Sequence, residues 1–320
     1  MMELGGAEIA GIKMHAAIDV TMRRNHIHHC TMGIWCDWEA QGTRLSQNLL
    51  HDNQRPPFAS VLKGGMMSQD IFVEVGHGPT LIDNNIMLSD ASLRFATEGV
   101  ALVHNLICGA LTCVGGGTGP RYTPYHMPHR TEVMGFMTVL HGDDRFYNNI
   151  FVQKWPSDDI ITMHDSDDGF DTENRAAGTW MFDEYPTYDE WISQFDFSKP
   201  ADMAKLYGAH EGKLPVWIEG NAYLGGAKPS KKDVNALISA VAREDVRVEL
   251  VQKEDGYYLD TNVYELIEGF KNRMIDSDVL GKAFEPEERF ENPDGTAIRF
   301  DSDYFGTHRG VDVIPGPFAG

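Results

Sequence analysis

The sequence predicts an all-β protein: a right-handed parallel β-helix, which is a solenoid of stacked coils, with a small α+β decoration in its C-terminal region. Three observations predict this fold. An asparagine recurs at about the length of one coil, short segments of alternating polarity lie between the asparagines, and two acidic residues occupy equivalent places in successive repeats.

The asparagine repeat sets the length of a coil. Each asparagine follows an apolar residue by three positions, in the pairs Met22/Asn25, Leu45/Asn48, Ile82/Asn85, Leu102/Asn105, Phe146/Asn149 and Ile218/Asn221. The intervals between the asparagines are 23, 37, 20, 44 and 72 residues. With about 20 to 23 residues per coil, 44 residues predict two coils, and 37 predict one coil with an insertion of about 14 residues near 55–68. A leucine-rich repeat has a similar period, but its regular leucine spacing is missing.

The stacking of coils explains why asparagine recurs at the same place in each repeat. Coils of a solenoid align like residues in ladders, and asparagine tolerates the left-handed backbone that tight corners require.

The two equivalent acids are Asp37 and Glu74. Asp37 lies 12 residues after Asn25; Glu74 lies 26 after Asn48, which is again 12 once the insertion is subtracted. The same spacing predicts one outward column, namely His15, Asp37, Glu74 and Thr97, flanked by Lys13, Trp35, Phe72 and Phe95. Strand alternation turns the intervening residues inward, where they are apolar as a core requires. Arg94 breaks this pattern.

An acid pair one coil apart suits double-displacement chemistry. Neighbouring strands lie about 4.8 Å apart, and a retaining glycosidase holds its two carboxyl groups about 5 to 5.5 Å apart, against about 6.5 to 9.5 Å in an inverting one. Trp35 offers a ring face to a sugar, and His15 and Thr97 offer hydrogen bonds. The alternative is that acids on the exposed face of an acidic chain align by chance, and that His15 and Thr97 belong to ordinary surface ladders.

Three segments also resemble a known family. Residues 8–13 (EIAGIK), 33–44 (GIWCDWEAQGTR) and 72–79 (FVEVGHGP) look like the catalytic coils of glycoside hydrolase family 120, the retaining β-xylosidases, and residues 281–286 (GKAFEP) are similar as well. The resemblance implies Asp37 as nucleophile and Glu74 as acid/base. It implies Glu8 near the sugar and places His77 in a catalytic segment, which makes His77 a further candidate for substrate binding. The family has earlier coils and a β-sandwich domain, so the chain resembles its C-terminal, catalytic part. An uncapped solenoid predicts either a missing N-terminal segment or association into homo-oligomers.

Two further segments carry polar groups. Residues 115–130 contain too many glycines and prolines for regular structure and predict a long loop, from which Arg121 and His126 reach the substrate; a loop that only packs on the solenoid is the alternative. The acidic segment 164–173 has the oxygen ligands of a calcium loop but not EF-hand spacing. We therefore expect a solvated turn, no cofactor and no metal ligands, with structural Ca²⁺ as the alternative.

The remaining pattern divides the chain into three parts. Residues 1–160 form the coils with the acid pair, 161–213 an acidic and aromatic insertion, and 214–320 a final coil with a helix and a hairpin. Residues 230–243 predict the helix, because Ser230 and Asp233 fit a capping box before an apolar stripe. Residues 246–251 and 257–260 predict the hairpin around Glu254-Asp255-Gly256.

Composition limits the partners. A net charge of −21 argues against nucleic acid, anionic membranes and polyanionic substrates, and favours a small neutral oligosaccharide. Mean hydropathy is −0.33; an apolar stretch long enough to span a bilayer and a leader-like start are both missing. The four cysteines lack a CxxC motif, so we expect reduced thiols and a cytoplasmic protein. The rival functions are a calcium-dependent polysaccharide lyase, with Lys13 as its base, and a non-catalytic carbohydrate-binding β-helix.

Overall fold

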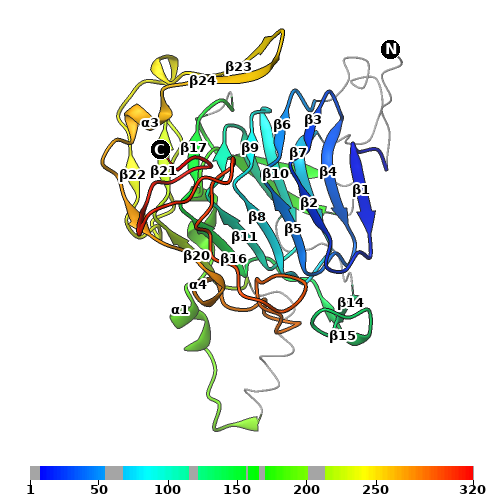
Figure 1. Cartoon of the computed structure of the whole chain (residues 1–320). Helices are drawn as coiled ribbons and strands as arrows, with labels where there is room; N and C mark the ends of the chain where they lie inside the picture. The colour runs from blue at the N-terminus through cyan, green and yellow to red at the C-terminus, as the bar shows by residue number, and fades with distance from the viewer. Residues whose placement is uncertain are drawn as a thin grey trace.

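The structure is a computed structural model that describes residues 8–54, 68–114, 122–155, 158–165, 170–200 and 213–319. It is built mostly of short strands in three large sheets (Figure 1). The first sheet contains β1 (Ile12–His15), β4 (Met32–Asp37), β7 (Gln69–Glu74), β10 (Ala91–Ala96), β13 (Ala110–Val114), β19 (Phe170–Ala176) and β18 (Ile161–Asp165). The second contains β2 (Thr21–Arg23), β5 (Thr43–Ser46), β8 (Thr80–Asp83), β11 (Val100–Val103), β16 (Asp144–Tyr147) and β20 (Val216–Glu219). The third contains β3 (His26–His28), β6 (Leu49–His51), β9 (Ile86–Met87), β12 (Leu106–Ile107), β17 (Ile150–Val152), β21 (Ala222–Leu224) and β22 (Leu237–Ile238).

The chain passes through the three sheets in turn. Each circuit, which we call a coil, adds one strand to each sheet, and successive strands within a sheet pair in parallel from β1 to β13. In Figure 1 the strands follow one another in colour order from blue β1 to yellow β21. The first sheet ends differently, because β19 and β18 add to β13 as an antiparallel pair. The prediction of an all-β fold with parallel sheets is confirmed.

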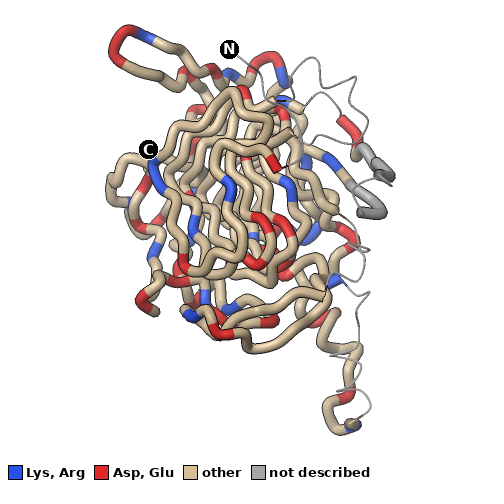
Figure 2. Tube along the Cα trace, turned by 90° about the vertical axis from the view of Figure 1, so that its right-hand side faces the viewer, with Lys and Arg blue, Asp and Glu red and all other residues tan. Residues whose placement is uncertain are grey.

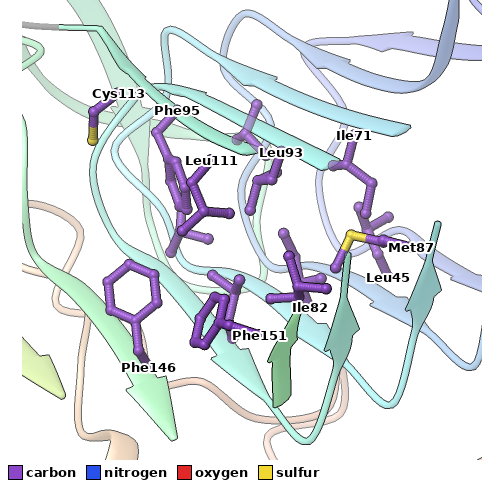
Figure 3. Close-up of a cluster of buried hydrophobic side chains, with 14 of the residues drawn as sticks. Leu45, Ile71, Ile82, Met87, Leu93, Phe95, Leu111, Cys113, Phe146 and Phe151 are labelled. Carbon is purple, nitrogen blue, oxygen red and sulfur yellow. The ribbon is translucent and has the colours of Figure 1, made fainter. Parts of the chain in front are cut away.

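The core lies between the three sheets. Leu45 and Ile82 from the second sheet, Ile71 from the first and Met87 from the third point toward one another in Figure 3 and are fully or almost fully buried. These are the inward positions that strand alternation predicts, and burying each such side chain stabilises the fold by about 1.5 to 3 kcal/mol.

The asparagine repeat forms a continuous ladder. Each asparagine Nδ2 donates to the Oδ1 of the next one along, at 2.9 Å for Asn25 to Asn48 and 3.0 Å for Asn149 to Asn221. From Asn48 onward, each Oδ1 also accepts from the backbone N–H of the preceding asparagine of the ladder, as Asn149 Oδ1 does from Asn105. Each Nδ2 from Asn48 onward also donates to the carbonyl of the apolar residue that lies three positions before the preceding asparagine, as Asn105 does to Ile82, three positions before Asn85. The repeat inferred from the sequence therefore corresponds to one buried hydrogen-bonded column.

Three details of the predicted coils are wrong. Asn105 and Asn149 bond directly at 2.9 Å, so the 44-residue interval is one coil with an insertion and not two coils. The insertion includes the hairpin of β14 (Tyr122–His126) and β15 (Val133–Thr138), where the sequence predicted an irregular loop. The left-handed corner residue is also not the asparagine but its predecessor, for example Gln47 at φ 57° and His104 at φ 58°.

The C-terminal region contains small elements around the coils. The predicted hairpin is confirmed as β23 (Val248–Lys253) and β24 (Gly256–Thr261), which projects from the body in Figure 1. The C-terminal region also contains η3 (Arg243–Asp245), α3 (Val263–Leu266), α4 (Ser277–Leu280) and the antiparallel pair β25 (Asn272–Arg273) and β26 (Asp312–Val313). Earlier in the chain, before β20, the described residues form η2 (Trp180–Glu184) and α1 (Tyr188–Ile192). Among the described residues, no helix combines the length and the apolar character needed to cross a bilayer.

The helix predicted over residues 230–243 does not form. The backbone N–H groups of Val234 and Leu237 donate to the carbonyls of Ile218 and Asn221 in the preceding coil, so the segment adds to the stacked coils. Asp233 does not cap a helix; its carboxylate accepts from Asn221 Nδ2 at 3.1 Å and extends the asparagine ladder by one acceptor. The unpaired edge of the last coil outcompetes the local helical pattern, because backbone donors at that edge need partners.

Candidate active site

The candidate acids lie at the ends of two paired strands. Strands β4 and β7 pair in parallel with Trp35 opposite Phe72 and Cys36 opposite Val73, so the next residues, Asp37 and Glu74, come one coil apart as the spacing predicted. Cys36 and Val73 belong to the core, and alternation therefore turns Asp37 and Glu74 to the other face of the sheet. Both acids are nonetheless buried, at 4% and 7% exposure.

Lys13 links two of the predicted acids. Its ammonium group forms ion pairs with both Glu8 and Asp37, and it lies 3.6 Å from the centroid of the Trp35 ring. Strand β1 places Lys13 opposite Trp35 and His15 opposite Asp37. The sequence named Lys13 as a residue flanking the column and as the base of the rival lyase; in the structure its ammonium group supplies the positive charge between Glu8 and Asp37.

Trp35 contacts the second acid. Its indole Nε1 donates to a Glu74 carboxylate oxygen at 3.0 Å, and its ring lies 5.4 Å from that of Phe72. Trp35 is only 6% exposed. This side chain therefore orients Glu74 through a hydrogen bond, in addition to the sugar-stacking role that the sequence suggested.

The predicted outward column of His15, Asp37, Glu74 and Thr97 is displaced by one residue in the fourth coil. Ala96, not Thr97, lies opposite Glu74, and Phe95 lies opposite Val73 in the core. The coil has one residue fewer between its asparagine and its strand, since Asn85 to Leu93 spans 8 residues where Asn25 to Ile34 spans 9. Thr97 instead uses its hydroxyl to donate to the Gly76 carbonyl at 2.7 Å.

The one-residue change of register in β10 places Arg94 on the outward face of the sheet. Arg94 is fully buried on the same row as Trp35 and Phe72, with its guanidinium 4.9 Å from the centroid of the Phe72 ring. The sequence treated Arg94 as a break in the pattern. The shorter spacing after Asn85 was the signal that could have placed it correctly.

His126 lies in the β14–β15 hairpin and His77 beside that hairpin, so neither belongs to the acid column. Ring nitrogen Nδ1 of His77 is 2.6 Å from Glu98 Oε1, and Nε2 is 3.2 Å from the Thr123 carbonyl. Burial lowers the pKa of His77, but the Glu98 carboxylate more than offsets this, so its pKa is raised. The backbone N–H of His126 donates to Gln41 Oε1 at 2.9 Å, four residues beyond Asp37.

The remaining candidates are placed as follows. His15 is exposed at the end of β1, and Glu8 is exposed but held by Lys13. Arg121, nearly all of the 55–68 insertion and the centre of the acidic segment 164–173 lie outside the described residues. The four cysteines are free thiols.

The chain is similar in sequence and fold to a solved structure of another protein. No protein-family model and no curated protein matches the chain. Among solved structures, the chain is similar to XylC, determined as a complex with xylose, at 33% sequence identity and a TM-score of 0.79. The similarity covers 98% of this chain and 43% of the XylC chain. The chain thus spans about two fifths of the length of a protein whose structure contains bound xylose.

Proposed function

We propose that this chain carries the catalytic acid pair of a retaining, exo-acting β-xylosidase, which releases xylose from xylo-oligosaccharides. Asp37 is the nucleophile, and Glu74 is the acid/base. The observation that carries the proposal is the pairing of β4 with β7, which brings two buried carboxylates onto neighbouring strands about 4.8 Å apart. That spacing suits the separation of about 5 to 5.5 Å in retaining enzymes.

The surroundings of the two acids support different roles. The Lys13 ammonium group is a counter-charge for an anionic Asp37, which is the state that a nucleophile requires. Glu74 accepts from the neutral indole of Trp35, which fixes its orientation. An acid/base must point at the glycosidic oxygen in both steps, so a fixed orientation favours Glu74 for that role.

The substrate class rests on the comparison and on charge. XylC was solved with xylose, and xylose and its oligomers are neutral. The 48 acidic residues of this chain outnumber the 27 basic ones, and Figure 2 shows both kinds spread along the visible trace. A neutral substrate avoids the repulsion that a polyanionic glycan would meet.

The proposal also covers the type of β-helix and the part of the enzyme that this chain represents. We infer that the coils form a right-handed parallel β-helix of the glycoside hydrolase family 120 type, and that residues 1–160 carry the site. By this proposal the chain corresponds to the C-terminal, catalytic part of a longer enzyme.

Proton NMR of xylobiose hydrolysis tests the proposal. We expect β-xylose as the first product, and near-complete loss of activity in Asp37→Ala and Glu74→Ala. Azide should rescue Asp37→Ala with an α-xylosyl azide as product, and should rescue Glu74→Ala, given an activated leaving group, with the β-azide. Asp90→Ala is the matched control, because Asp90 is an exposed acid away from the column, and it should retain activity.

Other products would contradict the assignment. Initial α-xylose would show inversion, and vinyl proton signals would indicate a lyase. Binding of xylobiose without hydrolysis would indicate a carbohydrate-binding protein.

A further inference from the structure

Three segments that are remote in sequence meet at the corner between the first and second sheets. Asp19 follows β1, His129 lies in the turn between β14 and β15, and Glu288 belongs to the C-terminal region. Their ligand atoms all lie within 4.8 Å of one another. His129 Nδ1 is 3.0 Å from Asp19 Oδ1 and 4.0 Å from Glu288 Oε1.

Glu288 is the most unusual member of this cluster. It is 1% exposed, and its Oε1 has no hydrogen-bond partner. Its other oxygen, Oε2, accepts from Gln41 Nε2 at 2.7 Å, so the side chain is held with Oε1 directed at Asp19 and His129. A buried carboxylate oxygen without a partner costs free energy unless a cation or donor satisfies it.

Gly42 leaves the room that the cluster needs. A Cβ atom at Gly42 would lie 2.3 Å from Asp19 Oδ1 and 2.8 Å from Glu288 Oε1, and the backbone there has φ +65°. Any larger residue would push the two carboxylates apart. The two oxygens therefore converge on one small space beside a residue that has no side chain.

The other nitrogen of His129 is also oriented. Nε2 is 3.4 Å from Glu291 Oε1, which places a carboxylate on the side of the ring opposite Asp19. A metal-binding histidine usually donates its second N–H to a carboxylate, and metal-binding carboxylates accept hydrogen bonds from their surroundings. Glu291 and Gln41 fill these two supporting positions.

We propose that Asp19, His129 and Glu288 bind a first-row divalent cation, Mn²⁺ or Zn²⁺. The donor set of two carboxylates and one imidazole nitrogen selects this class. Ca²⁺ and Mg²⁺ take oxygen ligands, and soft metals prefer sulfur, whereas Mn²⁺ and Zn²⁺ accept both carboxylate oxygen and imidazole nitrogen. Metal–ligand bonds of about 2.0 to 2.2 Å would fit within the cluster after small side-chain movements.

The cation would join three parts of the molecule. It would hold the β14–β15 hairpin and the C-terminal region against the corner that follows β1. The Asp19 N–H in that corner donates to the Gln41 carbonyl in the corner after β4, the strand that ends at Asp37. The competing explanation is that a protonated His129 alone balances the carboxylates. This inference does not depend on the proposed glycosidase activity, because its test measures metal binding.

Titration with Mn²⁺ tests the site on the untagged chain after chelator treatment. Electron paramagnetic resonance follows the loss of the free Mn²⁺ signal, and nitrogen modulation of the bound signal reports an imidazole ligand. We expect one equivalent bound, with displacement by Zn²⁺ but not by equimolar Ca²⁺. Glu288→Gln should weaken binding at least tenfold. Glu287→Gln is the matched control, because Glu287 is the exposed neighbour.

A second variant guards against misfolding. His129 is 20% exposed, and His129→Gln should remove the nitrogen modulation in a folded protein. No bound Mn²⁺ in the wild type would overturn the proposal. Displacement by equimolar Ca²⁺ would also overturn it. So would equal binding by Glu288→Gln, which would assign the ion to another site, such as the cluster of contacting imidazole rings formed by His26, His28, His29 and His51.

Discussion

At the scale of single residues, the structure changes the meaning of Trp35. The sequence offered it as a platform for a sugar, whereas its indole N–H holds Glu74 at 3.0 Å. Lys13 likewise holds Asp37 and Glu8. A side chain that fixes a catalytic carboxylate acts through orientation, so its loss affects turnover more than substrate affinity.

Trp35→Phe isolates this hydrogen bond. Phenylalanine keeps a ring against Phe72 but removes the Nε1 donor to Glu74. By the proposed function we expect kcat to fall roughly tenfold or more with little change in KM, because a lost hydrogen bond to a charged group costs about 1.5 to 3 kcal/mol. Steady-state kinetics on xylobiose measure this. Trp217→Phe, which keeps a ring beside Arg145 away from the column, should leave kcat unchanged. Equal losses in both variants would contradict the positioning role.

At the scale of elements, the asparagine ladder is the main polar support of the coils. Asn105 accepts from the backbone N–H and Nδ2 of Asn85 and donates to Asn149 and to the Ile82 carbonyl, all at 2.8 to 3.0 Å. It is fully buried. A residue in the middle of the ladder therefore forms hydrogen bonds with polar groups of both neighbouring coils.

Asn105→Ala should be strongly destabilising. It leaves the Asn85 N–H buried without a partner, at about 1 to 3 kcal/mol, and removes the Asn105 Nδ2 hydrogen bonds to the Ile82 carbonyl and to Asn149 Oδ1, at about 0.5 to 1.5 kcal/mol each. We expect the unfolding free energy to fall by roughly 2 to 5 kcal/mol. Asn25→Ala, at the partly exposed end of the described ladder, should cost about 1 kcal/mol. Urea denaturation of both variants measures the difference. Equal costs would mean that the ladder contributes little beyond one local bond.

At the scale of the whole molecule, buried acids make stability depend on pH. Burial raises the pKa of Asp70 to about 7, against hydrogen bonds from Ser89 and Asn53 that lower it. Burial also raises the pKa of Asp143 and of Asp233 to about 6 each. The unfolded chain titrates its aspartates near 3.9. The folded protein therefore holds more protons between about pH 4 and pH 7.

Stability should accordingly fall as the pH rises through this window. The contribution of each raised carboxyl group is fully present below about pH 4 and is lost as the pH passes the folded pKa. We expect a lower urea midpoint at pH 8 than at pH 5. Asp70→Asn should reduce this difference, whereas Asp90→Asn, at an exposed site, should not. An unchanged difference in Asp70→Asn would show that this group does not carry the effect.

The sequence by itself determined the features that repeat with the coil. The asparagine intervals located the ladder, and the common 12-residue offset brought Asp37 and Glu74 one coil apart, because stacking places equivalent residues of successive coils in register. Strand alternation assigned the inward side of β4 and β7 correctly for the same reason.

Only the tertiary structure decided what departs from the period. One missing residue after Asn85 moved Thr97 out of the column and Phe95 into the core. Residues 230–243 carried a helical pattern, but the open edge of the last coil offered hydrogen bonds that the pattern could not reveal. The meeting of Asp19, His129 and Glu288 joins three distant segments. The spacing of residues along the chain specifies which residues stack on the next coil. How an insertion packs onto the coils depends on contacts between segments that are distant in the sequence, and the spacing does not specify these contacts.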